Sequence, residues 1–222
     1  AYCVSELGWY GSRVSVDPAS HFDDVKRGVD DVLELQTEDD ESKFLGLGID
    51  VTYRGLLSEK YKQKYWALLD SIAKGYKTKI KYFTNHRGEK KPEFVVPKIV
   101  LYFDLSDVKD LVYLVKNSDN PAVLEEFRQS PQRISVLRQT VIQCDELAKF
   151  AGDMKNSIAL QYGEFGKAIR SLAEKHPVFA EALKGEETDD VAKHIRFLAK
   201  EFKEKELDKR MTQEVEASRE AA

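Results

Sequence analysis

Two aspartates in neighbouring apolar segments are the residues whose types and spacing point most directly to chemistry. Asp30 lies in residues 29–35 and Asp50 lies in residues 44–51. Both segments favour strands, and the polar, acidic residues 36–43 join them, so we expect a β-hairpin. Strand interiors disfavour Asp, so each of these aspartates needs a reason. On adjacent strands, the two carboxylates can hold a divalent cation through hard oxygen ligands.

Such a pair suits phosphodiester hydrolysis, which needs a nucleophilic water, a cation that polarises the phosphate and relief of the developing charge. Asp30, Asp50 and the carbonyl of Val51 are the predicted ligands of Mg²⁺ or Mn²⁺. Lys26 or Arg54 is predicted to stabilise the transition state. The alternative for each aspartate is a structural carboxylate paired with Lys or Arg at a strand edge.

Three polar residues before the first strand also have two interpretations. Asp23 and Asp24 are either additional ligands or groups behind them, with His21 bridging to them. The alternative is turn chemistry before a strand. Other kinds of site are disfavoured, because the chain has no Walker-type loop, no GxGxxG and no nucleophile elbow, and its four histidines share no spacing. Gly46-Leu47-Gly48 lacks the following glycine and the helix that receive a phosphate.

The net charge of −4 is unevenly distributed. Residues 1–53 carry four basic and twelve acidic groups, whereas residues 54–98 carry twelve Lys or Arg and four acids. An acidic segment beside a basic one suits a metal site next to a phosphate-binding surface, although two solvated faces explain it equally well. The predicted nucleic-acid-binding residues are Lys74, Lys77, Lys79, Lys81, Arg87, Lys90 and Lys91.

Aromatic residues interleave with these cations, and they can stack on bases. Among them, Tyr61 and Tyr65 have the spacing of a helix and are better explained as core residues. The others are Trp66, Tyr76, Tyr82 and Phe83.

Apolar periodicity and breakers predict the elements that must position these residues. In addition to the hairpin, we expect strands at 13–16, 78–83 and 99–103, helices at 58–75 and 106–115, a turn at 17–20 and a basic loop at 85–92. The order of elements favours an α/β fold with a mixed sheet and flanking helices. The strand at 99–103 is apolar throughout, which is typical of a strand buried on both faces.

The character of the chain changes after Pro121, where strand signals end. Helical spacing continues over residues 137–172, with Gly152, Gly163 and Gly166 as points where the helix can bend or break. A further helix over residues 188–202 is expected to fold back on the apolar side of the helical segment 137–172. We therefore predict an α/β domain at 1–117 and an α-helical subdomain at 121–222.

Residues 1–117 resemble the PD-(D/E)XK nuclease superfamily, whose core is a helix, a three-stranded meander, a helix and a strand. By this resemblance Asp30 takes the position of the first metal-binding acid and Asp50 that of the second. The family's lysine, two residues after the second acid, falls on Thr52, so the chain departs from the pattern there. Glu6 matches the extra acid on the first helix of some members.

The resemblance implies a restriction-endonuclease-like core and a Mg²⁺- or Mn²⁺-dependent nuclease acting on DNA. Lys26, Arg54 or Lys81 is then expected to replace the missing lysine. The alternative is an inactive version of the fold, a nucleic-acid-binding or scaffold protein that recruits a partner through its helical half. A helical interaction protein with a structural N-terminal sheet is the third hypothesis.

Composition indicates whether the protein associates with membranes and in which compartment it is expected. Charged residues make up 33% and hydrophobic ones 42%, and no apolar run approaches the roughly 20 residues of a membrane span. The polar first residues do not predict a signal peptide, and the absence of an initiator Met indicates a trimmed fragment. Cys3 and Cys144 lack metal-ligand spacing and are expected to be free core thiols in a reducing cytoplasm. We expect no membrane partner, and a homodimer or protein partner through the helical half.

Overall fold

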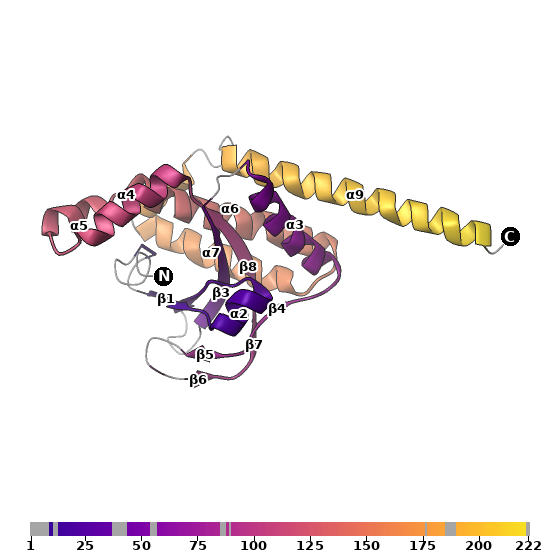
Figure 1. Ribbon diagram of the computed structural model, residues 1–222, viewed down its shortest axis with the longest axis horizontal. Coiled ribbons are helices and arrows are strands. Elements are labelled where there is room, and N and C mark those ends of the chain that lie inside the picture. Colours follow the sequence, from indigo (N-terminus) through magenta and orange to yellow (C-terminus); the bar gives the residue numbers. More distant parts are fainter. Residues whose placement is uncertain are drawn as a thin grey trace.

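The computed structural model describes residues 9–10, 13–36, 44–53, 57–84, 88, 90–175, 177–184 and 190–220. Four strands form the main sheet: β1 (Val14–Pro18), β2 (Asp31–Gln36), β3 (Phe44–Thr52) and β8 (Lys98–Tyr102). The strands lie in the order β1-β2-β3-β8, antiparallel up to β3, and β3 pairs with β8 in parallel. This arrangement confirms the predicted α/β class with a mixed sheet and flanking helices (Figure 1).

Helix α3 (Glu59–Ala73) lies in the crossover between the two parallel strands, as such a connection requires. Ser58 caps its first turn by accepting a hydrogen bond from the Tyr61 N–H. Its buried positions are those that the apolar spacing predicts: Tyr61, Tyr65, Leu68, Leu69 and Ile72. The prediction of this helix is therefore confirmed.

Helix α2 (His21–Arg27) follows the turn predicted at 17–20 and lies between the first two strands, where no helix was predicted. Ser20 caps the helix, and Gly28 ends it in the left-handed conformation, with φ at 61°. The first strand of the hairpin consequently begins at Asp31 rather than at Val29. A seven-residue helix with acids in its first turn has the composition of a turn, which explains why this helix was not predicted.

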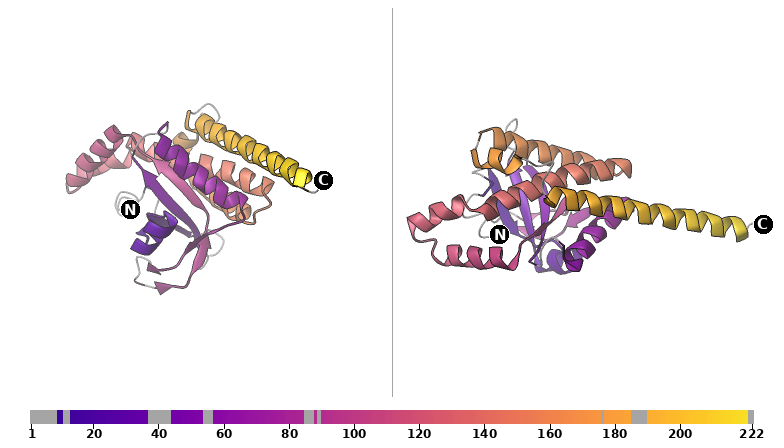
Figure 2. Two further views of the ribbon diagram at one scale, coloured as in Figure 1. Left: turned by 45° about the vertical axis from the view of Figure 1, so that its right-hand side comes forward. Right: turned by 90° about the horizontal axis from the view of Figure 1, so that it is seen from above.

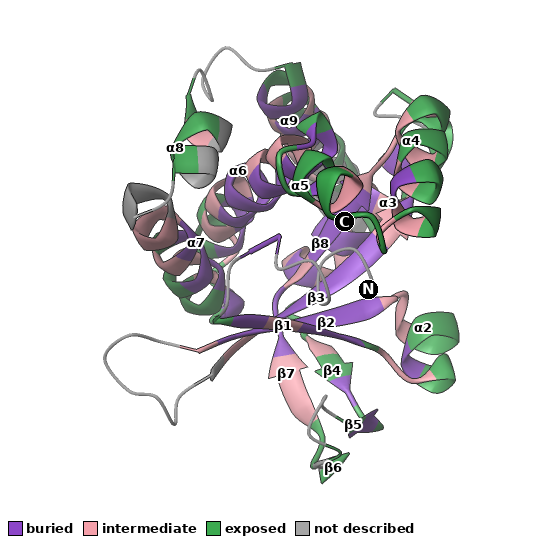
Figure 3. Ribbon diagram, turned by 90° about the vertical axis from the view of Figure 1, so that its left-hand side faces the viewer, coloured by how far each residue is buried: buried purple, intermediate pink, exposed green. Residues whose placement is uncertain are grey.

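A second layer of short strands projects from the sheet and is called the arm here (residues 76–96). It contains β4 (Thr78–Ile80), β5 (Phe83–Thr84), β6 (Lys90–Lys91) and β7 (Phe94–Val96). Strand β4 pairs with β7 and β5 pairs with β6, both antiparallel. Figure 3 shows the arm beside α2, on the side of the sheet away from α6 and α9. The single strand predicted at 78–83 is thus two, and β7 was not predicted.

The rest of the chain is helical. Its helices are α4 (Leu105–Lys116), α5 (Pro121–Arg128), α6 (Pro131–Asp153), α7 (Ile158–Lys175), α8 (Pro177–Leu183) and α9 (Asp190–Glu220). The apolar stripe at 137–172 is two helices, which separate after Gly152 at Lys155, where φ is 54°. Helix α9 packs against α3 and α6, as expected for a helix that folds back, and its C-terminal part extends beyond the body (Figures 1 and 2).

Side chains of α6 and α7 form hydrogen bonds with the backbone N–H and C=O groups on the outer edge of β8. The Gln143 amide accepts from the Val100 N–H at 2.9 Å and donates to its carbonyl at 2.8 Å. Gln139 does the same for Tyr102, and the Tyr162 hydroxyl does so for Lys98. Four helix residues rise about 6 Å and two strand residues about 6.6 Å, so an i, i+4 glutamine pair matches alternate strand residues.

One apolar cluster joins the sheet to helices from both predicted domains. It contains buried side chains of β2, β3 and β8 together with those of α3, α6, α7 and α9. Residues 1–117 and 121–222 therefore share a hydrophobic core. Cys144 is a buried free thiol within it, whereas Cys3 lies outside the described residues. No helix in the described part of the chain is long and apolar enough to cross a bilayer.

Candidate active site

The hairpin places Asp30 opposite Asp50. The register pairs Asp31 with Ile49, and the Asp30 N–H donates to the Ile49 carbonyl at 2.8 Å, which extends the pairing by one residue. The Asp30 side chain turns along the strand, and its Oδ2 accepts the Val51 N–H at 2.5 Å. Both carboxylates therefore lie at the Asp50–Val51 peptide, near the C-terminal end of β3.

Burial and charge disfavour ionisation of Asp30. The pKa of its carboxyl is raised above the usual range, first by burial and also by the neighbouring Asp50 charge. The Val51 N–H and the Lys64 ammonium act in the opposite direction. The pair is therefore a like-charge site in a partly dehydrated setting, which a cation stabilises.

Lys64 is the basic residue that helix α3 brings to this pair. Its Nζ forms an ion pair with Asp50 Oδ1 and also donates to the Val51 carbonyl at 2.9 Å. The side chain is 28% exposed, so Lys64 is partly accessible to solvent. Lys64 lies twelve residues after Thr52, outside any motif spacing, but it borders the buried Tyr61 and Tyr65. A lysine next to the buried positions of a predicted helix is the sequence feature that could have identified Lys64, and it was not used in the prediction.

Lys98 is a second lysine at the same carboxylate. Its Nζ lies 3.7 Å from Asp50 Oδ2 and donates to the carbonyls of Arg27 and Gly28 at 3.3 and 3.4 Å. Its side chain is only 13% exposed, and burial lowers its pKa, which Asp50 partly offsets. Lys98 thereby ties the end of α2 to Asp50.

Gly28 leaves the space for this contact. A Cβ at position 28 would lie 3.1 Å from Asp50 Oδ2 and 3.5 Å from Lys98 Nζ. The left-handed backbone there adds a second reason for glycine. Any side chain at this position would displace the Asp50 carboxylate.

The glycines of β3 have a packing role rather than a phosphate-binding one. A Cβ on Gly46 would lie 2.9 Å from Val96 Cγ1, and one on Gly48 would lie 3.4 Å from Val29 and from Val96. These two residues alternate with Leu47 and precede Asp50 on the same side of the strand. They allow the arm to cross the sheet close to the carboxylates.

The basic residues that contact Asp50 in the described part of the chain, Lys64 and Lys98, were not predicted from the sequence. Lys26 is exposed in the last turn of α2, and Arg54 lies outside the described residues. Lys64 and Lys98 contact Asp50 instead, because the crossover helix and the parallel strand converge on it. Sequence spacing does not reveal that convergence.

Asp23 and its neighbours do not join the pair. Asp23 is fully buried and accepts N–H groups of Lys81 and Tyr82, each at 3.1 Å, so it fixes the arm to α2. Asp24 and His21 are exposed on α2, and Glu6 lies outside the described residues. A helix cap and an arm anchor therefore account for Asp23.

The predicted nucleic-acid-binding lysines gather mainly on the arm. Lys77, Lys79, Lys81 and Lys90 are exposed there, Lys91 lies in β6, and Arg87 is outside the described residues. Lys79 pairs with Glu93 at 2.8 Å, and Lys74, after α3, pairs with Asp70 at 2.7 Å. Tyr61 and Tyr65 are buried, as expected of core residues.

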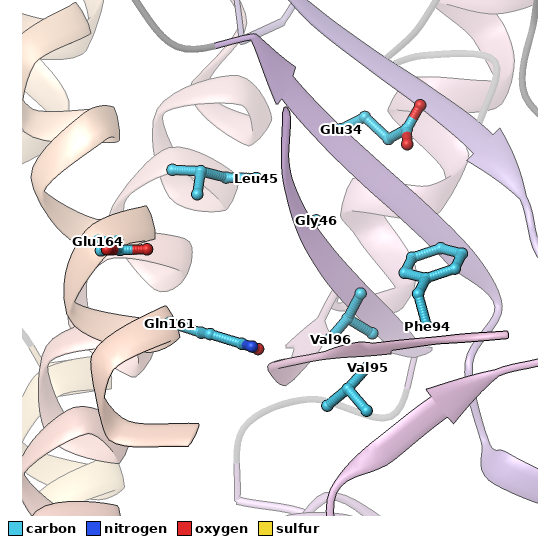
Figure 4. Close-up of a pocket in the computed structure, with 8 residues that line it drawn as sticks. All are labelled: Glu34, Leu45, Gly46, Phe94, Val95, Val96, Gln161 and Glu164. Carbon is cyan, nitrogen blue, oxygen red and sulfur yellow. The ribbon is translucent and has the colours of Figure 1, made fainter. Parts of the chain in front are cut away.

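A separate pocket of about 320 Å³ lies towards the other end of β3. Figure 4 shows it between β3, β7 and α7, with Gln161 pointing towards Val95 and Val96. Its charged lining residues are Glu34 and Glu164. This acidic lining does not suit a phosphate, so the carboxylate and lysine cluster around Asp50 is the stronger candidate.

Within the described residues, no group of three or more His, Cys, Asp or Glu is arranged to hold a metal ion. Two carboxylates and a carbonyl remain a suitable Mg²⁺ set, because Mg²⁺ takes one or two carboxylates and fills its other positions with water and substrate phosphate. No family model, curated protein or solved structure matches the chain.

Proposed function

We propose that this protein hydrolyses phosphodiester bonds of DNA with the help of Mg²⁺ or Mn²⁺. One observation carries the proposal: the Asp30 carboxylate and the Lys64 ammonium both bond the backbone of Val51, and Lys64 also pairs with the Asp50 carboxylate. Two acids and a cation, on two strands and a helix that share one core, are what metal-assisted phosphate chemistry needs.

We propose that the oxygens of Asp30, Asp50 and the Val51 carbonyl fit a divalent cation. The raised pKa of Asp30 supports this fit, because it reflects burial and the charge of Asp50, which a cation would offset. The ion would polarise the phosphodiester and favour ionisation of the attacking water. The positive charges of Lys64 and Lys98 offset the negative charges of the two acids. The ion would therefore give the site a net positive charge, which attracts an anionic substrate.

Lys64 is the residue we assign to the developing charge. Its ammonium donates to both Asp50 and the Val51 carbonyl, which leaves a third N–H that can donate to a phosphate oxygen or to a water beside the acids. Lys98 is a positioning residue, because it is largely buried and holds the Asp50 carboxylate against the end of α2.

The order of elements supports a relationship to the PD-(D/E)XK core. A meander carries the acids, and a helix crossover leads to a strand parallel to the third. Thr52, at the place of the family's lysine, is 1% exposed, so a lysine there would be buried. Lys64 would supply the same charge from the adjoining helix.

A second function is favoured by the two ion pairs of Asp50. Each of its oxygens has an ammonium partner, so the chain neutralises Asp50 without a metal ion. A domain with this balance could bind DNA without cutting it. We therefore keep an inactive, nucleic-acid-binding form of the same fold as the alternative.

Cleavage assays separate the two. The protein is incubated with single-stranded, duplex, branched and supercoiled DNA in Mg²⁺, in Mn²⁺ and in EDTA. The enzyme proposal expects cleavage of at least one substrate with metal, none in EDTA, and its loss in Asp30→Asn. Asn keeps an acceptor for the Val51 N–H, so the fold is preserved. Binding without cleavage of any substrate by the wild type supports the inactive form.

A further inference from the structure

Phe22 on α2 and Tyr82 on the arm form an exposed aromatic pair. Their ring centroids lie 5.4 Å apart at 84°, an edge-to-face contact. Phe22 is 39% exposed and Tyr82 is 56% exposed, so both rings retain surface available to a ligand. We call these two residues the aromatic platform.

Cations flank the aromatic platform. Lys81 Nζ lies 5.0 Å from the Tyr82 ring centroid and 5.7 Å from that of Phe22. The Arg27 guanidinium carbon lies 5.8 Å from the Phe22 centroid. Aromatic rings next to basic side chains are the combination that binds unpaired nucleotides, because the rings stack on bases and the cations contact phosphates.

Hydrogen bonds to the buried Asp23 carboxylate hold the aromatic platform in place. The buried Asp23 accepts the backbone N–H groups of Lys81 and Tyr82 and also the Ser20 hydroxyl, at 2.7 Å. Arg27 approaches the same carboxylate at 3.4 Å. These bonds fix the arm to α2. The two rings are therefore already ordered, and stacking of a base costs little further conformational entropy.

Helix α2 also connects the aromatic platform to the proposed active site. The carbonyls of Arg27 and Gly28 accept from Lys98, whose ammonium contacts Asp50. From Phe22 to Gly28 the helix rises about 9 Å. A strand whose phosphate lies at Asp50 can therefore place neighbouring nucleotides over the rings.

The surrounding charge suits a nucleic acid. The exposed lysines of the arm are Lys77, Lys79, Lys81 and Lys90, and Lys26 is exposed on α2. The exposed acids nearby in the described part of the chain are Asp24 on α2 and Glu93, which pairs with Lys79, while the buried Asp23 pairs with Arg27. The excess of positive charge favours phosphate contacts over a basic or neutral partner.

We propose that the aromatic platform stacks on unpaired bases of single-stranded DNA next to the active site. The inference rests on the proposed function for its choice of nucleic acid, and it specifies the substrate class. In a duplex the faces of the bases are covered by their neighbours, so the platform selects single strands or unpaired ends. Lys81 and Arg27 contact the adjoining phosphates.

Fluorescence anisotropy with a labelled 12-nucleotide oligothymidine and a 12-base-pair duplex tests this in EDTA, where cleavage does not interfere. Tyr82→Ala is expected to weaken binding of the single strand about tenfold or more, the effect of losing one base stack, and to leave duplex binding almost unchanged. The control is Tyr113→Ala, since Tyr113 is 61% exposed on α4 and lies outside the arm.

Phe22→Ala is the second variant and is expected to act in the same direction. Melting temperatures of all variants verify that each is folded. Absence of oligothymidine binding by the wild type overturns the proposal, and so does equal loss of single-strand and duplex binding in both platform variants. Because binding is measured without metal, a wild type that binds but never cleaves leaves this inference standing while the proposed hydrolysis fails.

Discussion

The two faces of the β2–β3 hairpin differ sharply in what they bury. One face carries Leu33 and Leu35 of β2 and Leu47 and Ile49 of β3, all at most 2% exposed within the main cluster. We call this the apolar face. The charged face carries the alternating residues Asp30, Val32, Glu34, Gly46, Gly48 and Asp50.

The two faces contribute differently to stability. Each leucine of the apolar face contributes about 2–3 kcal/mol through burial alone. The charged face instead holds two close carboxylates, a pair that raises the pKa of Asp30, and two glycines that admit the arm. The same strands thus combine a stabilising side with a side whose composition suits chemistry, and a mutation on each should affect a different property.

The apolar face should give the largest loss of stability. Leu33→Ala is expected to lower the free energy of unfolding by about 2–5 kcal/mol, because the site is fully buried and leaves a cavity. Urea denaturation measures it. The matched change Leu160→Ala, at a position 74% exposed, should stay within about 0.5 kcal/mol. Similar losses for both would mean that the apolar face is not the core.

The charged face should give the largest loss of activity. We expect Lys64→Met to reduce cleavage by about 10²–10³-fold, the effect of removing one group that stabilises transition-state charge. Lys62→Met is the control on the same helix: Lys62 is 27% exposed and pairs with Glu201, while Lys64 is 28% exposed and pairs with Asp50. Equal rates for the two variants would remove Lys64 from the mechanism.

The glycines of the charged face should be sensitive to size. Gly46→Ala is expected to lower the free energy of unfolding by about 1–3 kcal/mol, since its Cβ would meet Val96 Cγ1 at 2.9 Å. Val96→Ala should relieve part of that loss in the double variant. Gly152→Ala on α6 meets nothing within 4 Å and should stabilise the helix by up to about 1 kcal/mol. A neutral Gly46→Ala in thermal denaturation would contradict the close packing of the arm.

The smallest effect is expected from Asp30 in metal-free protein. Its pKa is raised on folding, so the native state binds the proton more tightly, and stability falls as pH rises from the usual Asp pKa through the raised one. Asp30→Asn should therefore melt slightly higher than the wild type at pH 7.5 in EDTA and equally at pH 3. A lower melting temperature at pH 7.5 would show that the Asp30 charge stabilises the fold.

The sequence was sufficient for the pairing of the two acids. The two apolar segments and the polar, acidic connection between them predicted the hairpin, and its register brings Asp30 opposite Asp50. The apolar spacing after Ser58 likewise predicted α3. Such patterns depend on neighbouring residues alone, so they can be recognised without a structure.

Lys64 and Lys98 could not be assigned in the same way. They reach Asp50 only because the crossover helix and the parallel strand converge there, which is a tertiary effect. The edge bonds of Gln139 and Gln143 to β8 depend on the same packing. Helix α2 was missed because its composition is that of a turn and its end depends on Gly28.

Calorimetric titration of Mn²⁺ tests the central claim, that Asp30 and Asp50 share one divalent cation. The wild type should bind one ion, and Asp30→Asn and Asp50→Asn should each weaken that binding at least tenfold. Asp70→Asn, which removes a carboxylate paired with Lys74 near the end of α3, should bind as the wild type does. Equal binding by the wild type and all three variants would contradict a shared site.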